Sequence, residues 1–362
     1  MPRSVDTVAV IGTGLIGTSI AMAAHRAGHR VVGIDADPSV LASAAAIATF
    51  EPADSVESAA AGASIAFVCT PIPTIASVAS EVLSRSDAVV SDVGSVKSHV
   101  VEEVERATPE HTARFVGGHP MGGSERSGPD GASASVLDGI AWVLTPTAST
   151  DPAAVARVER FASEVGAQPI LMNAERHDRL VAVVSHLPQV ASTALMGLAA
   201  EQEAGEPEIL QLAAAGFRDL TRLAASNPEL WAGILRANED AFSRALDLYI
   251  ERLNRLRELV AEGDGGLERA FADAKRARLG LAAKPQVRAG VAVLQVPVPD
   301  RPGVLADLTA ALGAADVNIE DLQIVHSPEG GRGTVHLTLA LDDLDRALAC
   351  LGSGGFEALR LA

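Results

Sequence analysis

A glycine-rich turn near the start of the chain constrains the fold more than any other feature. Residues 7–12 read TVAVIG, which is typical of a buried strand, and residues 12–17 read GTGLIG where a helix begins. In this pattern the first glycine makes the tight turn, the second lets a pyrophosphate approach, and the third lets the helix pack on the sheet. The helix N-terminus then faces the phosphate charge. The pattern predicts a Rossmann-type domain whose dinucleotide contacts Gly12, Gly14, Leu15, Ile16 and Gly17.

The end of the next strand candidate predicts which dinucleotide is bound. Residues 30–35 end in Asp35, and no arginine follows directly. A carboxylate there accepts hydrogen bonds from the ribose diol and would repel a 2′-phosphate, so NAD is expected rather than NADP. A later strand candidate ends at Thr70 and Pro71, which are expected to line the nicotinamide side of the crevice. A plain strand-to-helix turn is the alternative there.

The hydrophobic pattern divides the chain into three predicted domains. Residues 1–173 alternate Val/Ile-rich runs with Ala-rich helical stretches, which predicts βαβ units and a parallel sheet. Residues 174–282 show only helical spacing, and their apolar content indicates burial between the two subunits of a homodimer, with the core of a monomer as the alternative. Residues 283–290 are interpreted as a linker. Residues 291–362 run strand, helix, strand, strand, helix, the order of a small ferredoxin-like α+β domain.

Charge and composition exclude several classes of partner. The formal net charge of −17 repels nucleic acid and acidic membrane surfaces, so neither is an expected partner. A small anionic substrate must therefore meet local arginines or helix N-termini. The two cysteines do not form a disulfide framework, and no metal site is expected. No run approaches the roughly 18 uninterrupted apolar residues of a membrane span, and the N-terminus reads directly as a strand, so a cytoplasmic protein is expected.

A single histidine in a run of glycines is the first candidate for chemistry. Residues 117–128 read GGHPMGGSERSG, and residues 92–100 read DVGSVKSHV after the preceding strand candidate. Because the carboxyl ends of adjacent parallel strands share one edge, Ser95 and His119 are expected to approach one another. An imidazole with a hydroxyl partner is suited to accept a proton near neutral pH. A histidine satisfied by structural hydrogen bonds is the alternative.

The motifs together resemble a known enzyme family. In order they are GTGLIG, DVGSVK, GGHPMGGSERSG, HDRLVAVVSHLPQ and GFRDLTRLAASNPELW, and they look like those of prephenate dehydrogenases over about residues 5–282. The stretch VPDRPGVLADLTAALGAADVNIEDLQI resembles an ACT domain, a small amino-acid-sensing module. The resemblance implies an oxidoreductase that uses NAD to decarboxylate prephenate oxidatively in tyrosine biosynthesis.

The resemblance also implies roles for individual residues. His119 matches the catalytic histidine, Ser95 matches the serine that hydrogen-bonds the substrate hydroxyl, and Arg222 matches the arginine that holds a substrate carboxylate. The further substrate-binding positions are His186, Gln189, Ser124 and Trp231. Without the motif, Arg222 would be interpreted as a surface arginine, His186 as a core histidine, and Trp231 as a packing residue.

One departure from the family pattern leaves the substrate open. Many members that use prephenate read SHLPH, whereas this chain reads SHLPQ with Gln189. Glutamine donates a hydrogen bond but carries no charge, so recognition of the substrate side chain is uncertain. Prephenate is the first expectation, and arogenate, which has an amino acid in place of the keto acid, is the second.

The ACT-like region predicts an effector site. Its binding residues are expected to be Arg301, Gly303, Asn318 and Ile319, and the expected effector is tyrosine, with phenylalanine as the alternative. A domain kept only for dimerisation is a further alternative.

Two rival functions are less consistent with the sequence. A β-hydroxyacid or imine dehydrogenase would place a catalytic lysine on the helical half, but no lysine lies between Lys97 and Lys275. An NAD-binding amino-acid sensor without catalysis would not need the set of Ser95, His119 and Arg222.

Overall fold

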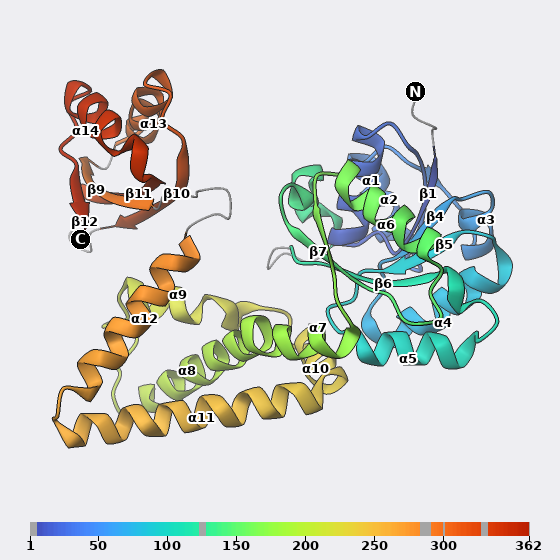
Figure 1. Cartoon of the computed structure of the whole chain (residues 1–362), viewed down its shortest axis with the longest axis horizontal. Coiled ribbons are helices and arrows are strands. Elements are labelled where there is room, and N and C mark those ends of the chain that lie inside the picture. The colour runs from blue at the N-terminus through green and yellow to red at the C-terminus, as the bar shows by residue number, and fades with distance from the viewer. Residues whose placement is uncertain (1–5, 123–127, 283–290, 300, 327–331, 362) are drawn as a thin grey trace. The chain divides into compact units, whose positions relative to one another are not determined.

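The structure is a computed structural model that describes residues 6–122, 128–282, 291–299, 301–326 and 332–361 (Figure 1). The chain forms two compact units. The first comprises residues 1–198 and 221–248, and the second comprises residues 199–220 and 249–362. The expected linker at residues 283–290 lies outside the described residues.

The first unit contains an eight-stranded sheet with the strand order β3-β2-β1-β4-β5-β6-β7-β8. The order reverses at β1, which has β2 on one side and β4 on the other, and this is where open α/β sheets bind dinucleotides. The prediction of a Rossmann-type domain is therefore confirmed. The strands are β1 (Thr7–Ile11), β2 (Arg30–Ile34), β3 (Glu51–Pro52), β4 (Ile65–Val68), β5 (Val89–Asp92), β6 (Phe115–Pro120), β7 (Ala141–Thr145) and β8 (Gln168–Leu171).

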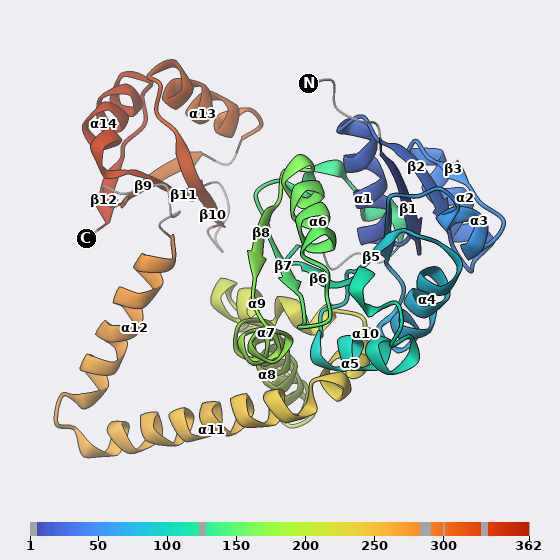
Figure 2. The same cartoon turned by 45° about the vertical axis from the view of Figure 1, so that its right-hand side comes forward.

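Helices cover both faces of this sheet (Figure 2). Side chains of α1 and α6 pack on one face around Phe67 and Trp142, and α4 and α5 pack on the other around Ile75 and Val100. Asp37 and Asp151 cap their helices, each ahead of a proline at the first helical position. The helices are α1 (Leu15–Arg26), α2 (Pro38–Ile47), α3 (Val56–Ala60), α4 (Ile72–Arg85), α5 (Ser98–Ala107) and α6 (Pro152–Glu164), with short turns η1 (Thr112–Arg114), η2 (Pro129–Gly131) and η3 (Ala134–Leu137).

The sheet differs from the sequence prediction at both edges. Strand β3 is only two residues long and exposed, and β8 at the other edge is mostly exposed, so neither carries a strong apolar signal. Strand β7 pairs antiparallel with β6, so the expectation of an all-parallel sheet is wrong. Two neighbouring strands can run parallel only if the chain crosses over between them, usually through a helix. The described part of the β6–β7 connection contains only the short turns η2 and η3.

The helical region begins with one long helical segment. Helix α7 (Ala174–Val181) continues through a π-turn, η4 (Ala182–His186), into α8 (Leu187–Glu203). Pro188 cannot donate to the carbonyl four residues earlier and would crowd it. In the π-turn Leu187 donates instead to the carbonyl of Ala182. The other helices are α9 (Ala215–Thr221), η5 (Arg222–Ala225), α10 (Pro228–Ala237), α11 (Glu239–Glu262) and α12 (Gly266–Ala282).

The segment Ala174–Glu203 is long and apolar enough, by length and composition alone, to cross a membrane. Buried polar side chains interrupt it, and several of them bond to groups on other elements of the first unit. Its exposed apolar residues, including Val184 at 65% and Leu198 at 57%, instead fit a helix that packs against another protein surface.

The second sheet belongs to the C-terminal region. Its strand order is β10-β11-β9-β12, all antiparallel, and both helices of this region cover the same face (Figure 1). Leu294, Leu308 and Leu337 lie in its buried core. The elements are β9 (Val291–Pro299), α13 (Val304–Ala314), β10 (Ile319–His326), β11 (Arg332–Ala340), η6 (Leu341–Asp343), α14 (Leu344–Ser353) and β12 (Leu359–Leu361), so the ferredoxin-like order is confirmed.

Candidate active site

The glycine-rich turn has the geometry that a dinucleotide requires. Gly12 has φ of +97°, and a Cβ there would lie 2.7 Å from the carbonyl oxygen of Cys69. A Cβ on Gly17 would lie 1.9 Å from the carbonyl oxygen of Gly12, so the helix approaches the turn closely. A Cβ on Gly14 would meet nothing within 4 Å. The turn is therefore packed on its inner side and open at the N-terminus of α1, where Leu15 and Ile16 begin the helix.

Two further groups fit the rest of a dinucleotide. The Oδ2 atom of Asp35 accepts the amide of Thr13 at 2.6 Å, which fixes the carboxylate beside the turn. The Oγ1 atom of Thr70 is buried and has no hydrogen-bond partner within the described part of the chain. Pro71 directly follows it and precedes α4. Because buried hydroxyls are nearly always bonded, the Thr70 hydroxyl fits a polar ligand group in the crevice.

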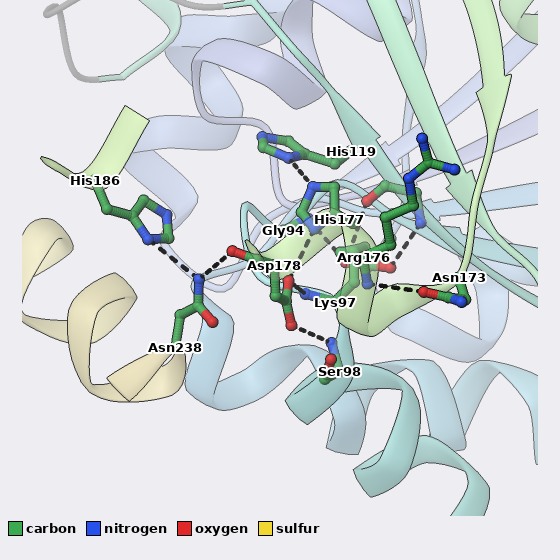
Figure 3. Close-up of polar contacts among 12 residues, drawn as sticks. Gly94, Lys97, Ser98, His119, Asn173, Arg176, His177, Asp178, His186 and Asn238 are labelled. Carbon is green, nitrogen blue, oxygen red and sulfur yellow. Dashed lines mark hydrogen bonds and ion pairs between the residues drawn. The ribbon is translucent and has the colours of Figure 1, made fainter. Parts of the chain in front are cut away.

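His119 lies in β6 and belongs to a chain of hydrogen-bonded side chains (Figure 3). Its Nδ1 atom is 2.8 Å from Nε2 of His177. The Nδ1 atom of His177 is in turn 2.8 Å from Oδ1 of Asp178. Burial lowers the pKa of His119 well below its ordinary value, and His177, Lys97 and His186 lower it further, whereas Asp178 opposes the shift. The imidazole is therefore neutral and able to accept a proton at neutral pH.

Asp178 connects α7 to the N-terminus of α5. Its carboxylate accepts the backbone amides of Lys97 and Ser98, each at 2.8 Å. Burial alone would raise the pKa of Asp178, but the hydrogen bonds from His177 and from those amides bring it below its usual value. The carboxylate is therefore ionised and can only accept hydrogen bonds.

A fully buried ion pair lies under the site. The Nζ atom of Lys97 donates to Oδ2 of Asp92 and, at 2.7 Å, to the carbonyl oxygen of Gly118. The amide of Gly118 donates to Oδ1 of Asp92 at 3.1 Å. Burial lowers the pKa of Lys97, and the carboxylate of Asp92 opposes that shift. The pair fixes the end of β5 against β6, next to the turn that holds Ser95.

Ser95 lies in this turn and is partly buried. The hydrogen bonds of the described residues join His119 to His177, and none of them joins His119 to Ser95. Sequence reasoning gave His177 and Asp178 no part in orienting His119. The adjacent residues His177 and Asp178 in the sequence are a signal for such an orienting pair. Only the fold shows that His177 bonds to the ring of His119.

His186 is brought into the same region by the π-turn. It lies nine positions after His177, so at about 100° per residue a regular helix would place the two on opposite faces. His186 is 1% exposed, its Nδ1 is 3.2 Å from Nδ2 of Asn238, and its Nε2 has no hydrogen-bond partner among the residues that the structure describes. Its ring centroid lies 6.1 Å from that of Trp231 on α10. Burial lowers the pKa of His186 to about 4.

Gln189, an expected substrate contact, also bonds to the segment that carries Arg222. Its Nε2 atom donates to the carbonyl oxygen of Leu223 at 2.8 Å, and its Oε1 accepts from Ser226 at 3.4 Å. Leu223 lies in η5 directly after the exposed Arg222, and Ser226 follows this turn. Gln189 therefore supports the turn with one of its two amide N–H groups. Ser124 lies outside the described residues.

The C-terminal region has a cavity of about 350 Å³ at the β9–α13 loop. Arg301 and Gly303 line it, together with apolar side chains that include Leu305 and Ile324. The other two expected effector residues, Asn318 and Ile319, do not line it. The Nδ2 atom of Asn318 instead donates to Oε1 of Glu320 at 2.6 Å. Among the described residues no cluster could hold a metal ion.

The fold and the site define a dehydrogenase with a nucleotide-binding domain, a helical domain and a C-terminal regulatory fold. Family models match in the same order: "Prephenate dehydrogenase, nucleotide-binding domain" at residues 20–171, its "dimerization domain" at 173–272, and "ACT domain" at 292–352. The chain is 32% identical to a prephenate dehydrogenase of Bacillus subtilis over 97% of both chains. It therefore belongs to the prephenate dehydrogenase family, as its motifs predict.

Other relatives show the range of this family. The chain is 34% identical to a cyclohexadienyl dehydrogenase of Zymomonas mobilis, over 78% of this chain and 98% of that one. Prephenate dehydrogenase of A. aeolicus, solved with hydroxyphenyl propionate and NAD+, matches with a TM-score of 0.72 and 30% identity, over 78% of this chain and all of that one. Arogenate dehydrogenase of Synechocystis matches with a TM-score of 0.66 and 31% identity, over 76% of this chain and 99% of that one.

Proposed function

We propose that this chain catalyses the NAD-dependent oxidative decarboxylation of prephenate to 4-hydroxyphenylpyruvate in tyrosine biosynthesis. The observation that carries the proposal is the neutral His119, which bonds to His177 near the carboxyl end of β6 in a dinucleotide-binding sheet. The similarity to the prephenate dehydrogenases of B. subtilis and A. aeolicus supports the substrate. The proposal includes a cytoplasmic homodimer with domain boundaries at residues 1–173, 174–282 and 291–362.

The proposed reaction needs few protein groups because aromatisation of the ring drives it. His119 accepts the proton of the substrate hydroxyl, and Ser95 hydrogen-bonds that hydroxyl. Arg222 holds a substrate carboxylate by its guanidinium fork. The residues thus orient the substrate and remove one proton while carbon dioxide leaves the ring.

The residues of the crevice suit NAD. The open N-terminus of α1 at Gly14 would receive the pyrophosphate, and the carboxylate of Asp35 would bind the ribose diol. Thr70 and Pro71 would line the nicotinamide side. When bound, NAD supplies the hydride acceptor.

Arogenate is the second candidate substrate. The uncharged Gln189 stands where many prephenate-using members have a histidine, and one of its amide N–H groups donates to Leu223. The likeness to cyclohexadienyl and arogenate dehydrogenases supports the same alternative. A comparison of kcat/KM for the two substrates decides between them.

The C-terminal cavity supports regulation by tyrosine. Arg301 offers a cation for the effector carboxylate, and the apolar wall of the cavity suits an aromatic ring. Gly303 has φ of +87° and nothing within 4 Å of an added Cβ, so backbone can approach a ligand there. Asn318 and Ile319 take part only if a second copy of the domain completes the site.

The proposal is tested by replacing the base. The His119→Asn variant is expected to lose about 10²–10⁴-fold in kcat with prephenate, while its affinity for NAD is retained. Formation of reduced cofactor measures turnover, and a parallel His25→Asn variant controls for loss of an exposed histidine. Unchanged turnover in His119→Asn would remove His119 from the role of base.

A further inference from the structure

Two histidines of the first unit each have one ring nitrogen that no described residue bonds. They are Nε2 of His119 and Nε2 of His186. The Nδ1 atom of His119 bonds to His177, which bonds to the carboxylate of Asp178. The Nδ1 atom of His186 bonds to Asn238, which bonds to the backbone carbonyl of Asp178. Figure 3 shows both chains of hydrogen bonds meeting at this residue. Their donor and acceptor roles follow from what Asp178 can accept.

The carboxylate of Asp178 determines the protonation of His119. An ionised carboxylate only accepts, so the nitrogen of His177 that faces it, Nδ1, carries the proton. A His177 ring that carries only this proton has a lone pair on its other nitrogen, Nε2, and accepts there from Nδ1–H of His119. A neutral His119 with its proton on Nδ1 has a lone pair on Nε2. The hydrogen bonds thus leave His119 with a free acceptor.

The backbone carbonyl of Asp178 determines the protonation of His186. A carbonyl oxygen only accepts, so the group of Asn238 that lies 3.0 Å from it is the amide NH2, which settles the orientation of that side chain. The same NH2 lies 3.2 Å from Nδ1 of His186, so Nδ1 accepts its second proton. Neutral His186 then carries its own proton on Nε2. The hydrogen bonds leave His186 with a free donor.

The free donor is buried. His186 is 1% exposed, and buried N–H groups nearly always have an acceptor, so its Nε2–H calls for an acceptor that an oxygen atom of a ligand would supply. An ammonium group has only donors and would face the Nε2–H of His186 without a hydrogen bond. Prephenate and arogenate differ by a keto oxygen against an ammonium, so this donor can distinguish them.

We propose that Asp178 sets the tautomers of His119 and His186 in opposite senses, and that the Nε2–H of His186 selects the keto acid over the amino acid by bonding a side-chain oxygen. The selection rests on the proposed function, but the tautomers do not. Asp178 and Asn238 are positioning residues, because each acts through an imidazole. The site then offers its substrate one proton acceptor and one hydrogen-bond donor.

The tautomers are tested by ¹⁵N NMR of the histidine rings in the full-length enzyme without substrate. The expected spectrum has the proton of His119 on Nδ1 and that of His186 on Nε2. Replacement of the donor by an acceptor in Asn238→Asp is expected to place a proton on Nδ1 of His186, while a His29→Gln variant, at a buried histidine beside Glu164, leaves the His186 signals unchanged. The opposite tautomer at either ring in the wild type, or a doubly protonated His177, would overturn the assignment.

The selection is tested by kcat/KM for prephenate and for arogenate. His186→Gln keeps a donor and should leave the ratio of the two values within about threefold, whereas His186→Glu offers an acceptor and should shift it toward arogenate by at least about tenfold. The His29→Gln variant controls for loss of a buried histidine, and NAD affinity reports folding. If His186→Gln and His186→Glu both bind NAD and have the same ratio of kcat/KM for prephenate to kcat/KM for arogenate, the proposed selection is refuted. A wild-type enzyme that oxidises neither substrate would refute the proposed function, and the NMR spectrum would still decide the tautomers.

Discussion

The candidate active site and the cavity of the ACT domain organise polar groups in opposite ways. In the active site, Lys97, Asp92, Asp178 and His177 are almost fully buried, and each bonds to another member of the network or to backbone. In the ACT cavity the one cation, Arg301, is exposed and pairs with exposed Asp307 at 3.0 Å, while the rest of the wall is largely apolar.

The difference follows from what each site has to fix. A base must present a lone pair in one direction, and a buried, fully bonded network holds the tautomer and ring orientation that this requires. An effector site needs only affinity, which an apolar wall and one exposed cation can supply. The active-site network should therefore be sensitive to single changes, and the ACT loop should tolerate them.

The largest expected effect is on the buried ion pair. Lys97→Met leaves the carboxylate of Asp92 buried without its cation, which should lower the free energy of unfolding by about 3–5 kcal/mol. Denaturant unfolding measures the change. Arg26→Met breaks the exposed pair with Asp138 and should cost less than about 1 kcal/mol. Similar losses in the two variants would remove the contrast between buried and exposed pairs.

The second prediction concerns pH. The lowered pKa of His119 means that its base form survives below the ordinary histidine pKa of about 6.5, so the acid limb of kcat/KM should lie below that value. His177, Lys97, His186 and Asp178 are the titratable groups that act on it. The same lowered pKa makes the native state resist protonation, so this contribution to stability is complete above pH 6.5 and is lost as pH falls through the folded-state pKa. An acid limb at or above pH 6.5 would contradict the burial of the base.

A smaller effect is expected in the ACT loop. Gly303 has φ of +87°, so Gly303→Ala should lower the stability of that region by about 1–2 kcal/mol and weaken tyrosine binding. Gly313 lies inside α13 with nothing within 4 Å of an added Cβ, and Gly313→Ala should stabilise by about 0.5–1 kcal/mol. Thermal unfolding and calorimetric titration with tyrosine measure both. The same sign of stability change in both variants would disprove the conformational argument.

The smallest stability effect is expected at the exposed pair of the same loop. Arg301→Gln should change the free energy of unfolding by less than about 1 kcal/mol, because the pair with Asp307 is solvated. It should nevertheless weaken tyrosine binding if the guanidinium meets the carboxylate of the effector. Asp307→Asn removes the pair but keeps the cation, and it should bind tyrosine at least as well as the wild type. If Arg301→Gln binds tyrosine as tightly as the wild type, another group binds the carboxylate of the effector.

Local sequence signals predicted most of the fold correctly. The Rossmann turn and the ferredoxin-like order both depend on neighbouring residues, so short windows contain the necessary information. The direction of β7 and the edge strand β3 were not predictable in this way. Pairing direction depends on where the chain returns, and β3 is too short to have a pattern.

The candidate site was only partly visible in the sequence. His119 was identified from its glycine-rich surroundings, and the fold adds His177, 58 positions away in the sequence, as the partner of its Nδ1 atom. The expected contacts of Ser95 and Gln189 with the substrate stay predictions, and the fold adds that Gln189 donates to Leu223, 34 positions away. Both added contacts join residues far apart in the sequence, so no short window contains them.

The sequence by itself determined which chemical groups this protein has and that it carries a dinucleotide turn, because glycine conformations, helix caps and hydrophobic periods act over a few residues. The tertiary structure alone decided which group each histidine nitrogen faces. A tautomer depends on which donor or acceptor lies within about 3 Å of each ring nitrogen. For His119 and His186 those partners come from other parts of the chain, positioned by a π-turn and by a capped helix start.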